Sequence, residues 1–188
     1  MRVSHKFSAE FDDDNLIAAG GLVPVMLLAQ SAGLSELVDE YVTVAGSRGA
    51  NADVKVSALV AGMVAGADSI SDMDLIRHGG MKRAFRELRA PTTLGTHLRG
   101  YTFGHVRQLD AIASRLLVAL AARVPGLVAG AEEMAYVDID DTIRETHGYA
   151  KQGTGYGYSG VKGLNALVAT LSTPTAAPSP MTGSAEAT

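Results

Sequence analysis

The stretch Ala135-Tyr-Val-Asp-Ile-Asp-Asp-Thr142 marks a change in how the chain is organised. Within it Val137 and Ile139 alternate with Asp138 and Asp140, the period-two pattern typical of a β-strand. Nearly everything before this stretch has helical periodicity, and the residues after it are predicted to form further strands. The sequence therefore predicts an α+β fold, with a helical region followed by the beginning of a sheet.

The acidic side chains of this stretch are candidates for binding a metal ion. Asp138, Asp140 and Asp141 place three carboxylates within four positions, and these repel one another unless a cation lies between them. Asp138 and Asp140 share a strand face, and carboxylate oxygens are ligands that suit Mg²⁺. Two such ions can stabilise the attacking and leaving oxygens of phosphodiester chemistry. The alternative is an acidic strand end and turn exposed to water.

The residues after this stretch predict a short sheet and then a tail. Thr142–Tyr149 is predicted to pair with the first strand, a glycine- and tyrosine-rich loop comes next over 153–163, and Leu164–Leu171 is predicted as a third strand. The proline-containing residues 173–188 are predicted to be disordered. The predicted domains are a helical region over 1–130, the start of a sheet-containing domain over 131–172, and the tail.

The residues before the stretch predict a series of helices, because apolar side chains recur at helical spacing between glycine and proline breaks. The last two of these helices have a helix–turn–helix rhythm around Gly100. The predicted helices are Leu22–Ala32, Leu34–Val44, Val54–Ala67, Ser71–His78, Met81–Leu88, Thr92–Arg99 and Gly104–Val124.

Positive charge is concentrated in the segment 77–107, which carries seven cations and one carboxylate. Six of the seven cations are arginines, whose planar guanidinium fits a phosphate group. The segment therefore predicts binding to nucleic acid. The alternative is a solvated helix face that pairs with the acidic first segment of the chain. The predicted DNA-binding residues are Arg77, Lys82, Arg83, Arg86, Arg89, Arg99 and Arg107.

Length and composition exclude several classes of protein. The chain has 188 residues, enough for one domain or two small ones, and its 47% hydrophobic content allows a sizeable core. It has no cysteine, which excludes disulfides, thiolate catalysis and cysteine-ligated metals. The uncharged stretch Asn15–Ser35 contains Pro24 and Gln30 and comes after an acidic run, unlike a signal peptide or a membrane span. We therefore expect a cytoplasmic protein with no membrane partner.

Several blocks of the sequence, taken in order, resemble the DDE transposases of bacterial insertion sequences, in the subgroup called DDE domain group 1. Their agreement in order is more specific than the acidic cluster alone, and together they cover roughly residues 15–173. The blocks are Ala67–Arg77, Ala90–Arg99, Phe103–Asp110, Val137–Thr142, His147-Gly148 and the glycine- and tyrosine-rich stretch through Asn165.

The resemblance implies a helical region that binds transposon-end DNA, followed by a ribonuclease-H-like domain that holds two Asp and one Glu around Mg²⁺. The first Asp of the family lies two residues before a Thr, which maps onto Asp140 and Thr142. Asp140 is thus the implied catalytic residue and metal ligand, and Asp138 is the other candidate because it shares the same face. The implied reaction is attack on a phosphodiester by water and then by a DNA 3′-hydroxyl.

The sequence also departs from the family. Beyond Asp141 its only carboxylates are Glu145 and Glu186, and neither matches the second Asp or the Glu of the family. We therefore expect a transposase that is truncated after the first strands of its catalytic domain and is inactive by itself. Whether the chain counts as an enzyme is left open. Its expected partners are transposon-end DNA and either a second copy or an intact transposase. Two alternatives are a non-catalytic DNA-binding regulator of an intact transposase and a non-functional remnant with an unpaired sheet edge.

Overall fold

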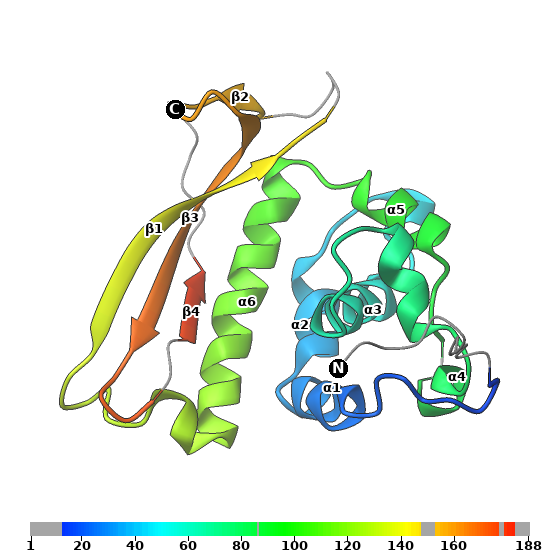
Figure 1. Cartoon of the computed structure of the whole chain (residues 1–188), viewed down its shortest axis with the longest axis horizontal. Helices are drawn as coiled ribbons and strands as arrows, with labels where there is room; N and C mark the ends of the chain where they lie inside the picture. The colour runs from blue at the N-terminus through cyan, green and yellow to red at the C-terminus, as the bar shows by residue number, and fades with distance from the viewer. Residues whose placement is uncertain (1–12, 86, 148–152, 177–178, 183–188) are drawn as a thin grey trace, which may run out of the picture. The chain divides into compact units, whose positions relative to one another are not determined.

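The computed structural model has a mixed α+β fold, as expected, and describes residues 13–85, 87–147, 153–176 and 179–182. The chain forms two compact units, one over residues 1–101 and the other over 102–188 (Figure 1). The division falls between α5 (Pro91–Leu98) and α6 (Phe103–Arg123), the two helices of the expected helix–turn–helix. The pattern of the sequence had instead predicted a boundary at residue 130.

The first unit is a cluster of helices, and the predicted helices are present with shifted ends. The predicted helix over 71–78 is a 3₁₀ helix, and the one over 81–88 ends at Ala84 because Phe85 is extended. The elements are α1 (Leu22–Ser31), α2 (Leu34–Tyr41), η1 (Gly46–Arg48), α3 (Ala52–Val64), η2 (Ser71–Ile76), α4 (Met81–Ala84) and α5 (Pro91–Leu98).

Glycine and proline residues determine where the helices of this unit begin and end. Gly33 lies between α1 and α2 with a φ of 88°, a left-handed conformation that glycine adopts without a steric penalty. Pro91 occupies the first position of α5, where a missing N–H costs nothing. The core is formed by fully buried side chains such as Leu34, Met81 and Leu94.

Helix α3 buries a different face from the one its large side chains suggested. Helical spacing puts Val56, Met63 and Val64 on one stripe, and Val56 is buried, but Met63 and Val64 are 62% and 52% exposed. The buried face instead carries small residues such as Ala58 and Ala61, with Gly62 directly beneath the Met73 side chain. Small residues on this face of α3 allow η2 to pack closely against it.

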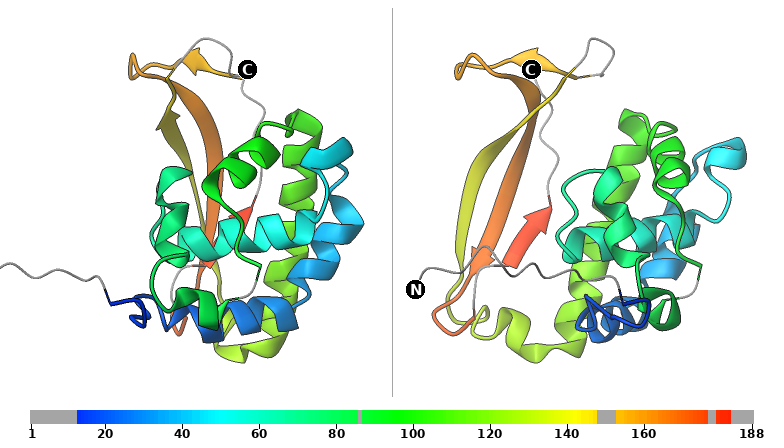
Figure 2. Two further views of the ribbon diagram at one scale, coloured as in Figure 1. Left: turned by 90° about the vertical axis from the view of Figure 1, so that its right-hand side faces the viewer. Right: turned by 45° about the vertical axis from the view of Figure 1, so that its right-hand side comes forward.

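The second unit consists of a long helix and a small antiparallel sheet. Helix α6 (Phe103–Arg123) begins with a capping box, in which Thr102 and His105 each bond the backbone of the other. It is followed by η3 (Pro125–Val128) and by β1 (Tyr136–Glu145), β2 (Gly155–Tyr156), β3 (Lys162–Ser172) and β4 (Ser179–Thr182). Figure 2 shows β1 and β3 as a long twisted ribbon with β4 beside β3.

The predicted pairing of the first two strands was wrong. β1 continues through Thr142 to Glu145 as one strand and pairs with β3, with Asp140 opposite Val168. A hairpin after Asp141 would need turn residues, whereas Thr142 and Ile143 are β-branched and favour extended backbone.

The predicted disorder of the tail was wrong for residues 179–182, which form β4 and pair antiparallel with β3. The reason is that β3 has a second edge, whose N–H and C=O groups can bond another strand whatever its side chains are. Residues 177–178 and 183–188 of that tail lie outside the described part of the chain.

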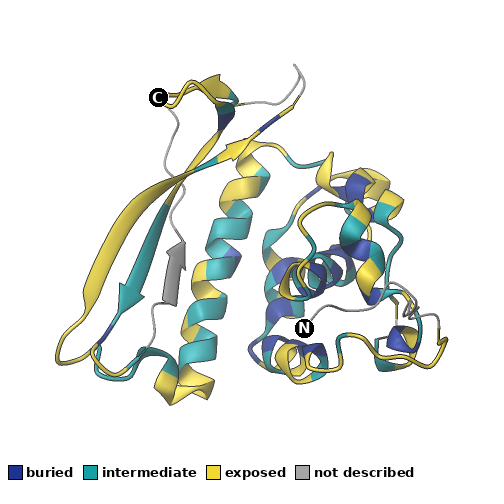
Figure 3. Cartoon of the chain, viewed as in Figure 1, coloured by how far each residue is buried: buried dark blue, intermediate teal, exposed yellow. Residues whose placement is uncertain are grey.

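Buried side chains gather in the helical unit, whereas β1 is exposed along almost its whole length (Figure 3). Val137 and Ile139, the apolar members of the alternating pattern, are 52% and 61% exposed. No single helix in the described ranges is long and apolar enough to cross a membrane, although α1 and α2, bent by 55°, pass that test of length and composition as a pair.

Candidate nucleic-acid interface and acidic strand

Asp138 and Asp140 lie on the same face of β1, as the sequence predicted. They stand opposite Thr170 and Val168 of β3, and both are exposed. One oxygen of Asp140 accepts a hydrogen bond of 2.8 Å from the backbone N–H of Asp141. The two carboxylates are therefore close neighbours on an open surface of the sheet.

These carboxylates do not make a metal centre in the described part of the chain. No group of three or more His, Asp or Glu side chains that could hold a metal ion is found there. Asp141 is on the opposite face of β1, and its carboxylate accepts a hydrogen bond of 3.1 Å from the amide of Asn165. Mg²⁺ is commonly held by one or two carboxylates, with water and phosphate oxygens completing its six ligands, but the implied site also needs a second Asp and a Glu, and the described residues bring neither to Asp138 and Asp140. The residues present thus do not fit the Mg²⁺ site that the resemblance implies.

The predicted DNA-binding residues belong to both units of the structure. Arg107 lies on α6 in the second unit, whereas the other described members belong to the helical unit. Arg77 forms a salt bridge with Asp74, and Arg89 is half-buried with its Nε unsatisfied. Arg86 lies outside the described residues.

The remaining cations are open to solvent. Lys82 and Arg83 are exposed on α4, and no carboxylate within the described ranges forms a salt bridge with either. Arg99 is exposed at the end of α5 and donates a hydrogen bond of 3.1 Å to the hydroxyl of Thr96. Arg48 is exposed in η1. The alternative reading, neutralisation by the acidic first segment, applies to Arg77, whose partner Asp74 lies three residues earlier in η2.

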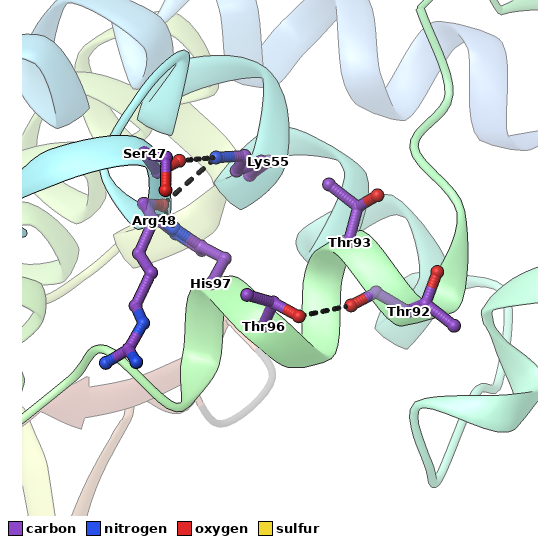
Figure 4. Close-up of a pocket in the computed structure, with 7 residues that line it drawn as sticks. All are labelled: Ser47, Arg48, Lys55, Thr92, Thr93, Thr96 and His97. Carbon is purple, nitrogen blue, oxygen red and sulfur yellow. Dashed lines mark hydrogen bonds between the residues drawn. The ribbon is translucent and has the colours of Figure 1, made fainter.

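A buried polar cluster, which the sequence did not predict, joins η1 to α3 and α5. His97 is fully buried, and its Nδ1 lies 2.6 Å from the carbonyl oxygen of Arg48. Lys55 is only 6% exposed and donates hydrogen bonds to the carbonyls of Ser47 (3.3 Å) and Arg48 (3.0 Å) (Figure 4). The ring of Tyr101 packs edge-on against His97, and the two polar atoms are 3.1 Å apart.

Burial, more than hydrogen bonding, sets the protonation state of His97. A carbonyl oxygen can only accept, so Nδ1 of His97 carries the proton toward Arg48 and Nε2 accepts from the Tyr101 hydroxyl. Burial lowers the pKa of His97 below its usual value, and the nearby Lys55 ammonium acts in the same direction. The Arg48 carbonyl opposes this shift but does not outweigh it, so the ring is neutral at pH 7.

This neutral histidine predicts an acid-sensitive helical unit. Because the pKa of His97 is lower in the folded chain than the 6.5 of an ordinary histidine, the unfolded chain takes up the proton first. Stability should therefore be complete above about pH 6.5 and should fall as the pH drops below that value. Urea unfolding between pH 7.5 and pH 5.5 measures this, with His97→Gln as the variant expected to lose the dependence. An equal pH dependence in that variant would assign the effect to other groups.

A pocket of about 260 Å³ lies beside this cluster, between η1 and α5. Its walls are Ser47 and Arg48, the buried Lys55 and His97, and the α5 threonines Thr92, Thr93 and Thr96. The lining therefore contains three basic residues and no carboxylate. In Figure 4 the Arg48 side chain extends away from Thr92, while Lys55 points toward the backbone of η1.

The sequence contained one signal for this cluster. Lys55 is a charge between Val54 and Val56, near the start of a largely apolar helix, where a buried lysine needs a specific partner. Its partners could not be found from the sequence, because they are the backbone carbonyls of Ser47 and Arg48, which every residue type carries. His97, which meets the same Arg48 carbonyl, is 49 residues away from it.

Comparison with known proteins adds no relative: no family model, no curated protein and no solved structure matches the chain.

Proposed function

We propose that this chain is a DNA-binding protein related to DDE transposases, that its helical unit contacts the phosphate backbone of DNA, and that the chain by itself does not cleave DNA. The observation that carries the proposal is the exposure of Lys82 and Arg83 without a carboxylate partner among the described residues. Exposed Arg48 and Arg99 add to the positive charge of the same unit. The ordered blocks that resemble the transposases support transposon-end DNA as the target.

Such cations bind DNA by displacing the counterions condensed on its phosphates, so affinity falls as salt rises. Phosphate contacts position a protein on DNA, whereas contacts with base edges select the sequence. The proposal therefore concerns affinity for the duplex, with the transposon-end sequence as the site to be compared with unrelated DNA.

Replacing Lys82 and Arg83 together by glutamine should weaken DNA binding by about tenfold at moderate salt. It should also reduce the slope of log affinity against log salt by about two, because roughly one counterion is released for each phosphate contact. Fluorescence anisotropy with a labelled duplex measures both quantities. Arg123→Gln is the matched control, since Arg123 is exposed outside the segment 77–107 and donates to the carbonyl of Ala119. Equal salt slopes in the two variants would refute the assignment of DNA phosphate contacts to α4.

A catalytic transposase is the second candidate, and the shared face of Asp138 and Asp140 favours it. Since the described residues supply no third metal-binding side chain near that face, we expect no nicking of transposon-end DNA with Mg²⁺ or Mn²⁺. The measurement is a gel assay of end-labelled duplex with the wild type and Asp140→Ala. Nicking by the wild type that disappears in Asp140→Ala would establish this candidate and overturn the proposed lack of cleavage.

A further inference from the structure

The pocket between η1 and α5 contains a buried positive charge for which the described residues supply no anionic partner. Lys55 is 6% exposed, and among the described residues it meets only the neutral carbonyls of Ser47 and Arg48. An ammonium group has three N–H donors, so one is left without an acceptor there. Removing a charge from water is costly unless an opposite charge compensates it, and the pocket lining contains no carboxylate.

A second set of unused donors lines the same pocket. Helix α5 begins after Ala90, which gives no side-chain cap, and the hydroxyls of Thr92 and Thr93 have no partner among the described residues. The backbone N–H of Thr92 is likewise unused, whereas that of Thr93 donates to the carbonyl of Ala90. The first turn of a helix favours negative charge, because its N–H groups point outward from the helix end.

We propose that this pocket binds a phosphate group of the DNA backbone, with Lys55 supplying charge and Thr92 and Thr93 supplying hydrogen bonds. The inference rests on the proposed function for the source of the phosphate, but the pocket chemistry stands independently of it. His97 is neutral and already bonded on both ring nitrogens, so its part is to hold the carbonyl of Arg48, and with it the pocket wall, in place.

A phosphate fits these observations better than a carboxylate does. Its tetrahedral oxygens can accept from donors on several walls at once, and the pocket presents donors from α3 and from two successive residues of α5. A volume of about 260 Å³ also leaves room for bridging water, each molecule of which occupies about 30 Å³.

The test uses the full chain and two probes, inorganic phosphate and a short duplex DNA. The double variant Thr92→Val and Thr93→Val removes both hydroxyls from exposed positions while keeping side-chain shape, so it should fold. Thr142→Val, an exposed threonine on β1, is the control for the same chemical change. Calorimetry with phosphate and anisotropy with DNA should each show at least a tenfold loss of affinity in the double variant and none in the control.

The outcomes separate this inference from the proposed function. Loss of both affinities in the double variant, with phosphate competing against DNA, supports it in full. Phosphate binding that depends on the threonines without any DNA binding by the wild type keeps the pocket and refutes the proposed function. If the double variant loses phosphate affinity but keeps its DNA affinity, the pocket binds phosphate, and the DNA backbone is refuted as the source of that phosphate. DNA binding that is unchanged in the double variant, without detectable phosphate binding, overturns the inference and leaves the proposed function intact.

Discussion

Replacing His97 by alanine is expected to lower the free energy of unfolding of the helical unit by about 3–5 kcal/mol. The ring is fully buried, so its removal leaves a cavity of the kind that costs this much when an aromatic core residue is truncated. The substitution also leaves the Arg48 carbonyl and the Tyr101 hydroxyl without the partner that His97 provides. Urea unfolding followed by far-ultraviolet circular dichroism at pH 7.5 measures the change.

The control for this variant is His78→Ala, because His78 is exposed just after η2. A surface substitution of this kind should change stability by no more than about 0.5 kcal/mol. If the two variants unfold at the same urea concentration, His97 does not hold η1 against α5 in solution.

Replacing Gly49 by alanine should destabilise the same unit by about 3 kcal/mol. A Cβ atom on Gly49 would lie 1.6 Å from the carbonyl oxygen of Val44 and 2.7 Å from its carbonyl carbon. Backbone cannot rotate away as a side chain can, so the 44–49 loop would have to move. Gly49 has a φ of −83°, which alanine adopts readily, so the cost arises from the clash rather than from backbone conformation.

Gly21→Ala provides the matched comparison. Gly21 also has an ordinary φ, of −62°, and a Cβ there would meet nothing within 4 Å. Its stability should stay within about 0.5 kcal/mol of the wild type. Equal melting temperatures for the two variants would show that the close approach of Gly49 to Val44 is absent in solution.

The helices were predicted well where the apolar periodicity and the glycine or proline residues at the helix ends indicated the same boundaries. Gly33 separates α1 from α2, as the local sequence indicated, and α5 begins at Pro91, one residue before the predicted start at Thr92. The prediction held only in part for α3, where Val56 is buried together with small residues such as Ala58 and Ala61, while Met63 and Val64 are exposed. Periodicity identifies the helix, but which face is buried depends on the neighbour that approaches it.

The sheet was predicted less well for a different reason. Strand character over Tyr136–Glu145 was visible in the sequence, but the partner of a strand is chosen by distant residues. β1 pairs with β3, and β3 in turn pairs with residues 179–182, whose side chains gave no strand pattern. Backbone hydrogen bonds made that pairing, and they are independent of side-chain type.

By itself the sequence determined the α+β order of elements, the concentration of cations over 77–107, and the common face of Asp138 and Asp140 on one strand. Each of these depends on neighbours along the chain, through periodicity, charge and the two-residue repeat of a strand. Only the tertiary structure decided that Lys55 and His97 meet at the carbonyl of Arg48, and that Lys82 and Arg83 stay exposed without a described carboxylate partner. Such outcomes depend on which distant backbone and side-chain groups come within hydrogen-bonding distance, and the folded chain alone sets those distances.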